Sequence, residues 1–365
     1  MIVAPKIVAP GSTIGIVGGG QLGRMLAMAA AQLGYRCHIF DPHEHPPAAD
    51  VAAFFTRAAF TDTAALEQFG RAVDVATYEF ENLPVESLKV LGDKLRPGLM
   101  SLAVAQDRAE EKRFIESTGA RVASWRTVAS LDEVRAAVAE LGVPLVLKTR
   151  RYGYDGKGQA WAREPGSAAA AWDAIDREPA IAEAAVDFAA EFSVILARTA
   201  SGETAVWDVP VNSHDDGILR RSTIPAGQPV EALAERAIEI AIGLAEALDH
   251  VGVFTVEFFA CSAGPVVNEI APRVHNSGHW TIDGADTSQF EQHVRAICGL
   301  PLGSTRRRAP SVSMDNLIGG DVLAWPMLLA EPGVHLHLYG KGDPRPGRKM
   351  GHVTRLSDQG PTAAG

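Results

Sequence analysis

The sequence predicts a mixed α/β and α+β protein with three parts. Strands and helices alternate over roughly the first 105 residues, which predicts a doubly wound, Rossmann-like parallel sheet. From residue 180 onward, apolar segments follow one another across short turns, a pattern typical of antiparallel sheet. The tail after Thr305 is rich in Gly, Pro and basic residues and predicts a small β-rich domain. The expected domains span residues 1–106, 107–304 and 305–365.

Composition narrows the class of protein. The 365 residues include 34 basic and 44 acidic side chains, and the net charge of −10 argues against nucleic-acid or anionic-membrane partners. Cys37, Cys261 and Cys298 lie far apart without metal-binding spacing, as expected of reduced thiols. The first residues lack the apolar core of a signal peptide, and no uncharged apolar run approaches ~18 residues. We therefore expect a cytoplasmic protein.

The N-terminal domain begins with a buried strand, TIGIV, over residues 13–17. A glycine turn over 18–23 leads into a helix over 24–34, which Gly34 closes. Further along we expect a strand over 35–41, a helix from Thr63 and a strand over 73–80.

The turn GGGQLG matches the dinucleotide-binding pattern through Gly18, Gly20 and Gly23. Asp41 ends the next strand, where a ribose-binding acid would sit, so these residues alone favour a nicotinamide- or flavin-dependent oxidoreductase. Glycines, however, let backbone N–H groups approach any phosphate, and a helix N-terminus favours any anion. A tight turn without a ligand is the third alternative. The motif indicates phosphate more strongly than it indicates NAD.

The middle domain opens with a helix that ends at Gly119, and Asp107 and Glu110 form a capping-box-like start. A second helix over 131–142 has Ser130 as its expected N-cap, and a strand over 143–149 runs into the loop 150–159. The remaining expected elements are strands at 180–186, 192–198, 204–212, 251–259 and 265–271 and a helix at 230–249.

Two glutamates are expected to face each other across a hairpin. If the turn CSAG is centred on Ala263, Glu257 and Glu269 are cross-strand partners, with Cβ atoms ~4.5–5.5 Å apart. Carboxylates so placed repel unless a cation separates them or one is protonated. Mg²⁺ typically takes one or two carboxylates plus substrate phosphates. The alternatives are two unrelated acids on a solvated face, or a pair neutralised by Lys or Arg.

Lys148 and the loop behind it indicate a site for a polyphosphate. A lysine within the apolar strand VPLVLKT either solubilises a sheet edge or points its charge into a site. The following loop, RYGYDGKGQ, contains Gly153, Gly156 and Gly158, which allow a mobile flap with exposed N–H donors. Lys157 adds positive charge for a triphosphate.

Together these segments resemble the ATP-grasp superfamily, and closely the N5-carboxyaminoimidazole ribonucleotide synthases of purine biosynthesis. The resemblance runs from about Thr13 to about His352, and Val274 stands where the family pattern has proline. It rests on GGGQLGRM (18–25), TYEFEN (77–82), QDRAEEK (106–112), GYDGKGQ (153–159), HDDGILR (214–220), NEIAPRVHNSGHW (268–280) and GRKMGH (347–352).

The resemblance implies a three-domain enzyme in which an ATP-grasp domain clamps ATP between two β-rich subdomains. The reaction would convert 5-aminoimidazole ribonucleotide, bicarbonate and ATP into the N5-carboxylated nucleotide, ADP and phosphate, through carboxyphosphate. It also implies Mg²⁺, with Mn²⁺ as a substitute, no biotin, no NAD, and a homodimer.

The resemblance further assigns residues to ATP and metal. Glu183 and the Val186 backbone would meet adenine, Glu191 the ribose, and Lys148 the phosphates. Glu257 and Glu269 would hold the metal. The full ATP set is Arg108, Lys148, Gly153, Tyr154, Asp155, Gly156, Lys157, Gly158, Gln159, Glu183, Val186, Glu191, His214, Asn268 and Glu269.

Catalysis and the ribonucleotide involve other residues. Arg273, whose fork suits an oxyanion, would surround bicarbonate and the amine together with His275 and Asn276, and Lys157 completes the catalytic set; the general base stays unassigned. The basic segment 340–349 is either part of the substrate-phosphate site or a solvated hairpin. The ribonucleotide set is Gly20, Gln21, Leu22, Glu79, Tyr154, Asp155, Lys341 and Arg348.

Three alternatives remain beside this interpretation. A formate-dependent glycinamide ribonucleotide transformylase shares the glycine-rich loop and the paired glutamates, although the HNSGH loop disfavours it. An NAD-dependent oxidoreductase follows from GGGQLG and Asp41. A nucleotide-binding regulatory protein without activity would have no need of two opposed carboxylates.

Overall fold

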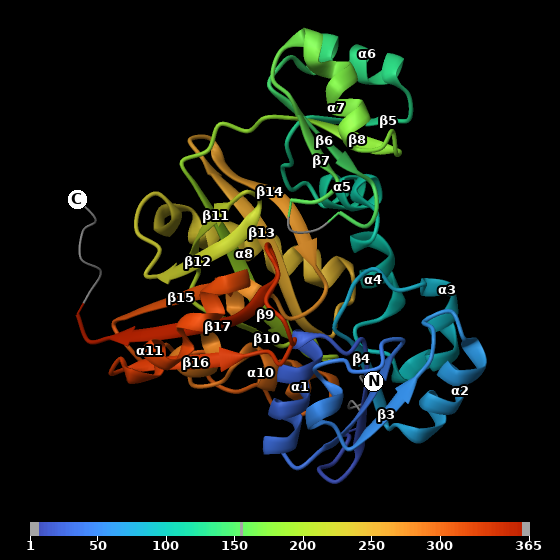
Figure 1. The fold of residues 1–365 in the computed structure, drawn as a ribbon, viewed down its shortest axis with the longest axis vertical. Coiled ribbons are helices and arrows are strands. Elements are labelled where there is room, and N and C mark those ends of the chain that lie inside the picture. The colour runs from blue at the N-terminus through green and yellow to red at the C-terminus, as the bar shows by residue number, and fades with distance from the viewer. Residues whose placement is uncertain (1–6, 154–155, 360–365) are drawn as a thin grey trace.

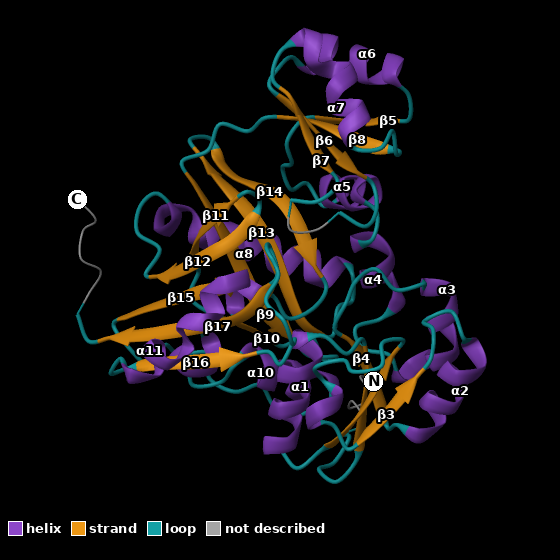
Figure 2. Ribbon diagram, in the orientation of Figure 1, coloured by secondary structure: helices purple, strands orange, loops and turns teal. Residues whose placement is uncertain are grey.

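The structure is a computed structural model that describes residues 7–153 and 156–359. Within these residues the strands form three sheets, one parallel and two antiparallel (Figures 1 and 2). Figure 1 places the N-terminal domain at one end, a small helix-covered sheet at the other, and the largest sheet beside them. The predicted combination of a doubly wound N-terminal domain with antiparallel middle and C-terminal parts is confirmed.

The N-terminal domain contains a four-stranded sheet in the order β3-β2-β1-β4, in which every strand pair is parallel. All five residues of β1 are buried, as expected for a strand covered on both faces. Its elements are β1 (Thr13–Val17), α1 (Gln21–Gln32), β2 (Arg36–Asp41), η1 (Ala49–Val51), β3 (Phe54–Arg57), α2 (Thr63–Ala72), β4 (Val75–Tyr78), α3 (Val85–Leu88), η2 (Lys89–Lys94) and α4 (Leu99–Ala105).

The smaller antiparallel sheet, in the order β5-β8-β6-β7, packs against α6 and α7 around Val134, Leu145 and Trp172. Asp107 caps α5 and Ser130 caps α6, as predicted, by accepting backbone N–H groups of the first turn. The elements are α5 (Arg108–Ser117), β5 (Trp125–Val128), α6 (Leu131–Leu141), β6 (Leu145–Thr149), β7 (Gln159–Ala162), η3 (Pro165–Ser167), α7 (Ala168–Ala174) and β8 (Ala180–Ala184).

The larger sheet has nine strands in the order β14-β13-β9-β11-β12-β15-β17-β16, with β10 beside β9. Because β12 pairs with β15, this sheet continues across residue 305 into the C-terminal strands. Its elements are β9 (Ala190–Arg198), β10 (Thr204–Val206), β11 (Val211–Asp215), β12 (Ile218–Ile224), α8 (Val230–Ala247), β13 (Gly252–Cys261), β14 (Gly264–Ala271), η4 (Asn276–Gly278), α9 (Thr281–Gly284), α10 (Gln289–Ile297), β15 (Ser311–Ile318), η5 (Gly319–Ala324), α11 (Trp325–Ala330), β16 (Val334–Leu338) and β17 (Lys349–Ser357).

Two sequence-based boundaries were wrong. The single strand expected over 204–212 is divided into β10 and β11, because Pro210 has no N–H for a ladder and Trp207 turns into the core. Helix α1 begins at Gln21 rather than at residue 24, so the glycine turn is shorter than expected. Among the described residues, no helix is both long and apolar enough to cross a membrane.

Candidate active site

One cavity of about 810 Å³ lies where the three sheets meet. It is lined by residues from both ends of the chain and from the middle, so segments distant in sequence contribute to one site. The predicted residues that line it are Gln21, Leu22, Glu79, Arg108, Gly153, Lys157, His214, Glu257, Glu269, Arg273, His275, Asn276, Lys341 and Arg348.

The two predicted metal-binding glutamates are direct partners across the β13–β14 hairpin, but not for the expected reason. Near the turn, Cys261 pairs with Gly264, so the turn is one residue tighter than the sequence interpretation assumed. A β-bulge then places Asn268 as an extra residue between the partners of Phe258 and Glu257. The bulge restores the pairing of Glu257 with Glu269.

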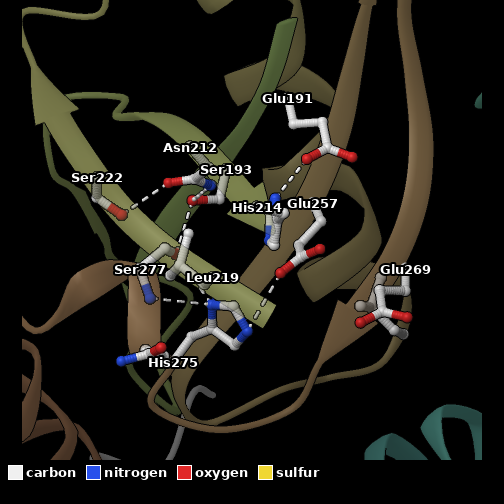
Figure 3. Close-up of polar contacts among 12 residues, drawn as sticks. Glu191, Ser193, Asn212, His214, Leu219, Ser222, Glu257, Glu269, His275 and Ser277 are labelled. Atoms are coloured by element: carbon white, nitrogen blue, oxygen red, sulfur yellow. Dashed lines mark hydrogen bonds and ion pairs between the residues drawn. The ribbon is translucent and has the colours of Figure 1, made fainter. Parts of the chain in front are cut away.

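The two carboxylates have different neighbours. Glu269 accepts a hydrogen bond from Arg108 at 2.8 Å, whereas Glu257 lies 3.3 Å from Nε2 of His275 (Figure 3). Burial and the charge of Glu269 raise the pKa of Glu257 to about 7. Burial would also raise the pKa of Glu269, but the charge and hydrogen bond of Arg108 outweigh it and lower that pKa to about 2. The repulsion expected between the two carboxylates therefore favours protonation of Glu257, while Glu269 stays ionised.

Two buried lysines connect the two antiparallel sheets. Lys148 on β6 lies 3.2 Å from Glu183 on β8 and 3.4 Å from Oδ1 of Asn268 on β14. Lys112 on α5 lies 3.1 Å from the other oxygen of Glu183 and donates to the Asn268 carbonyl at 2.9 Å. The bulged backbone therefore has a cationic donor. Burial opposes ionisation of Glu183, but the two lysines lower its pKa to about 2.

Polar contacts join the loop after β14 to the TYEFEN segment and to β15. Arg273 forms an ion pair with Glu81 of the TYEFEN segment. The amides of Asn276 and Asn316 exchange two hydrogen bonds, of 2.9 and 2.7 Å, which join the loop to β15. Burial, with the nearby charge of Arg273, lowers the pKa of His275 to about 3, so its imidazole is neutral.

Glu191 on β9 and His214 on β11 form a hydrogen-bonded pair beside Glu257 (Figure 3). Burial disfavours the charged imidazole, but the bond to Glu191 and the charge of Glu257 raise the pKa of His214. Glu191 itself, like Lys148, Glu183 and Asn268, does not line the cavity. Three of these residues, Lys148, Glu183 and Asn268, are instead joined to one another by the contacts of the buried lysines.

The glycine turn is occupied by side chains of the protein. Asp41 accepts the Gly19 N–H at 2.8 Å, and Glu79 accepts those of Gly20 and Gly23 at 3.0 and 3.2 Å. Asp41, which the dinucleotide interpretation would assign to ribose, therefore supports the turn. Gln21 and Leu22 line the cavity with the first turn of α1, where helical N–H groups have no intrahelical acceptor.

The glycine-rich loop closes one side of the cavity through Gly153 and Lys157. Gly156 and Gly158 have φ values of 76° and 69°, which favour glycine, whereas Tyr154 and Asp155 lie outside the described residues. Among the other predicted residues, Gly20, Gly156, Gly158, Gln159 and Val186 do not line the cavity.

Sequence reasoning assigned no role to several residues of the site. Glu81, Glu111, Arg150, Arg345 and Lys349 also line the cavity. Lys112 is 1% exposed and lies behind them. Four of them belong to motifs that carry the family resemblance: Glu81, Glu111, Lys112 and Lys349. Membership of those motifs is the sequence signal that could have identified them.

Comparison with known proteins identifies the class. Family models match as the ribonucleotide synthetase preATP-grasp domain over residues 12–106, the ATP-grasp domain over 113–290 and the phosphoribosylaminoimidazole carboxylase C-terminal domain over 312–364. The chain is therefore an ATP-grasp ligase.

Close relatives identify the family. The N5-carboxyaminoimidazole ribonucleotide synthase of Brucella melitensis is 49% identical, with 95% of this chain and 97% of that protein covered. The corresponding protein of Bacillus subtilis is 41% identical, over 96% and 93%. The chain belongs to the N5-carboxyaminoimidazole ribonucleotide synthase family.

Solved structures agree with this assignment. An ADP complex of an N5-carboxyaminoimidazole ribonucleotide synthetase superposes with a TM-score of 0.93 at 43% identity, covering 97% of this chain and 94% of that one. The enzyme from Aspergillus clavatus, in complex with ADP and 5-aminoimidazole ribonucleotide, gives a TM-score of 0.89 at 30% identity, covering 95% and 94%.

Proposed function

We propose that this chain catalyses the ATP- and bicarbonate-dependent carboxylation of 5-aminoimidazole ribonucleotide to N5-carboxyaminoimidazole ribonucleotide, with release of ADP and phosphate. The observation that carries the proposal is a cavity to which the N-terminal, ATP-grasp and C-terminal segments all contribute. ATP is the co-substrate, in keeping with the ATP-grasp family and with relatives solved with ADP or ATP.

ATP is proposed to enter from the side of the two lysines. Lys148 would face its phosphates and the Glu191–His214 pair its ribose. Both carboxylate oxygens of Glu183 are engaged by lysines, so adenine would meet the backbone of Glu183 and Val186. Lys112 and Lys148 would then fix the orientation of the two sheets between which the nucleotide lies.

Mg²⁺ is proposed at Glu257 and Glu269, with Mn²⁺ as a substitute. Two opposed carboxylates supply the hard oxygen ligands that Mg²⁺ prefers, and substrate phosphates complete its coordination. The part of the chain that the structure describes has no group of three or more His, Cys, Asp or Glu side chains able to hold a metal alone. When bound, the cation would neutralise charge that develops on the transferred phosphoryl group.

Bicarbonate is proposed to lie beside Arg273, His275 and Asn276, where one of its oxygens attacks the γ-phosphorus and displaces ADP. The carboxyphosphate so formed, or CO₂ released from it, then reacts with the exocyclic amine of the ribonucleotide. Arg273 would bind the oxyanion, and Lys157 would offset charge on the phosphoryl group. Closure of the glycine-rich loop would exclude water from this labile species.

The ribonucleotide is proposed to lie between the N-terminal and C-terminal segments of the cavity. Its phosphate would meet the first turn of α1 at Gln21 and Leu22, where the helix dipole favours an anion. Lys341 and Arg348, which also line the cavity, would add positive charge from the C-terminal segment. Glu79, which is hydrogen-bonded to the glycine turn, would accept hydrogen bonds from the ribose hydroxyls.

The protein is proposed to be a homodimer. Large apolar side chains are exposed on the adjacent segments η5, α11 and β16, where covering by a second copy would remove them from water. They are Leu323, Trp325, Met327, Leu329 and Leu338. Analytical ultracentrifugation should give a mass near twice the 38.7 kDa of the chain.

Bicarbonate labelled with ¹⁸O tests the proposed reaction. Attack by a bicarbonate oxygen on the γ-phosphorus transfers that oxygen to phosphate, so phosphate released during turnover should carry one ¹⁸O. Mass spectrometry of the phosphate measures the label. Phosphate without label would show that water, rather than bicarbonate, attacks ATP.

A further inference from the structure

A chain of buried polar side chains ends at His275 (Figure 3). Ser222 lies 2.8 Å from Oδ1 of Asn212, and Nδ2 of Asn212 lies 3.1 Å from Oγ of Ser193. Ser193 is 2.7 Å from Oγ of Ser277, which is 2.9 Å from Nδ1 of His275. All three serines are 0% exposed and Asn212 is 6% exposed, yet none of the four lines the cavity. The chain reaches the lining of the cavity at His275.

The backbone of Ser277 sets the direction of every bond in this chain. Its N–H, which can only donate, points at Nδ1 of His275 at 3.3 Å, so Nδ1 carries a lone pair. The Ser277 hydroxyl therefore also donates to Nδ1 and accepts from Ser193. Ser193 in turn accepts from the Asn212 amide, whose oxygen accepts from Ser222. The opposite direction would bring Nδ1–H against the Ser277 N–H.

Because Nδ1 carries the lone pair, the ring proton lies on Nε2, the atom 3.3 Å from Oε1 of Glu257. We propose that Ser277, Ser193, Asn212 and Ser222 are positioning residues that hold His275 as its Nε2–H tautomer, so that it offers the reacting anions a hydrogen-bond donor and not a base. This inference rests on the proposed place of bicarbonate beside His275.

The direction of the chain matters because the groups expected near His275 are anions. Bicarbonate, carboxyphosphate and the γ-phosphate each accept hydrogen bonds, and a preorganised N–H stabilises charge without reorganisation during the reaction. A base at Nε2 would need a lone pair there. Reversal of the tautomer would break both bonds from Ser277 to Nδ1.

The tautomer can be measured directly. The full chain, labelled with ¹⁵N-histidine, is studied by long-range ¹H–¹⁵N NMR at neutral pH, and His275 is assigned by the signals missing from His275→Gln. We expect an unprotonated Nδ1 and a protonated Nε2. A proton on Nδ1, or two tautomers in similar amounts, would overturn the proposal. This measurement does not depend on turnover, so it is distinguishable from a failure of the proposed function.

Two substitutions of His275 test whether its side chain acts as a hydrogen-bond donor. Glutamine can place an amide N–H near the position of Nε2 but cannot take up a proton, whereas leucine offers neither. We expect the kcat of His275→Gln to be at least about tenfold higher than that of His275→Leu, because the loss of a hydrogen bond to a charged group lowers a rate by at least about that factor. Equal kcat values for the two variants would contradict the donor role.

Ser193→Ala tests the chain one step away from His275. The expected result is a kcat about threefold to tenfold lower, an unchanged KM for ATP, and a second tautomer of His275 in the spectrum. The matched control is Ser101→Ala, which removes the hydroxyl of another buried serine, 3.0 Å from Nδ1 of His250. It should leave kcat and the tautomer of His275 unchanged.

An unchanged spectrum and kcat in Ser193→Ala would show that the chain does not hold the tautomer. If Ser193→Ala does not fold, the wild-type spectrum and the two substitutions of His275 still decide the question.

Discussion

Lys112 makes several contacts in the site that its local sequence does not indicate. It lies within a charged helical segment, where a lysine is ordinarily solvated. In the structure it is 1% exposed and contacts both Glu183 and the carbonyl of the bulged Asn268. Sequence reasoning placed the acidic partner in the site, but 71 residues separate the pair, and only the fold brings them together.

Lys112→Met should lower the free energy of unfolding by about 3 kcal/mol, because it leaves a buried carboxylate with one cation fewer. Chemical denaturation measures the change. Lys89→Met, which removes an exposed ion pair with Glu86, is the matched control and should cost less than about 1 kcal/mol. Adding Glu183→Gln to Lys112→Met should restore part of the loss; no restoration would mean that the ion pair with Glu183 does not account for it.

Glu269→Gln should abolish turnover while the fold is retained. The amide keeps the size of the carboxylate and an acceptor for Arg108 but loses the charge that a divalent cation needs. Phosphate release and thermal unfolding measure the two effects, and Glu235→Gln, at an exposed position of α8, is the control. Normal ATP turnover in Glu269→Gln would remove Glu269 from the metal site.

The Glu191–His214 pair predicts a pH-dependent contribution to stability. The pKa of His214 is raised above 6.5 in the folded protein, so the contribution is complete below about pH 6.5 and is lost as pH rises through the folded pKa. Glu191→Gln should therefore destabilise the protein most in mildly acidic solution. Urea denaturation across a pH series measures the difference from wild type; a difference that grows with pH would contradict this account.

At the scale of elements, the β13–β14 hairpin was predicted correctly in its outcome and wrongly in its detail. Alternation of apolar residues located both strands, and the pairing of Glu257 with Glu269 is confirmed. The bulge at Asn268 has no local sequence signal, because the carbonyl of the extra residue is satisfied by Lys112, which belongs to a different element. Register can be predicted from a turn only when no bulge follows.

The glycine turn gave a similar result. Its pattern predicts an anion near the N-terminus of α1, and the structure places the Glu79 carboxylate there. Nothing in the pattern indicates whether that anion is a ligand or a side chain 59 residues away in the chain.

The glycine-rich loop yields a prediction for its own element. A Cβ at Gly158 would lie 2.4 Å from Oγ1 of Thr149, and its φ of 69° is strained for any other residue, so Gly158→Ala should distort the loop. We expect kcat to fall about tenfold or more, because about 1–3 kcal/mol of strain falls on a segment that we propose to position phosphates. Gly166→Ala, where a Cβ meets nothing within 4 Å, is the control. Equal kcat values would exclude a role for this conformation.

For the whole molecule, the sequence indicated the three parts, and the motif resemblance indicated which segments share a site. It could not show that the larger sheet continues through β15 into the C-terminal strands. That continuity brings Lys341 and Arg348 to the cavity that the first turn of α1 also lines at Gln21. Such an arrangement depends on strand pairing between distant segments, which local patterns do not specify.

Lys341→Ala and Arg348→Ala test this arrangement. Each should raise KM for the ribonucleotide by about tenfold and leave KM for ATP nearly unchanged, because one charged hydrogen bond to the substrate phosphate is lost. Steady-state kinetics with each substrate varied in turn measures both constants. Arg355→Ala, which removes ion pairs to Asp315 and Glu331 away from the cavity, is the control. Equal increases for both substrates would place the phosphate elsewhere.

The most direct test of the central claim is phosphate release from ATP, Mg²⁺ and bicarbonate, measured with and without 5-aminoimidazole ribonucleotide. We expect strong stimulation by the ribonucleotide, because the cavity brings its proposed site next to the one proposed for ATP. Phosphate release that the ribonucleotide does not stimulate, but that glycinamide ribonucleotide with formate does, would contradict it.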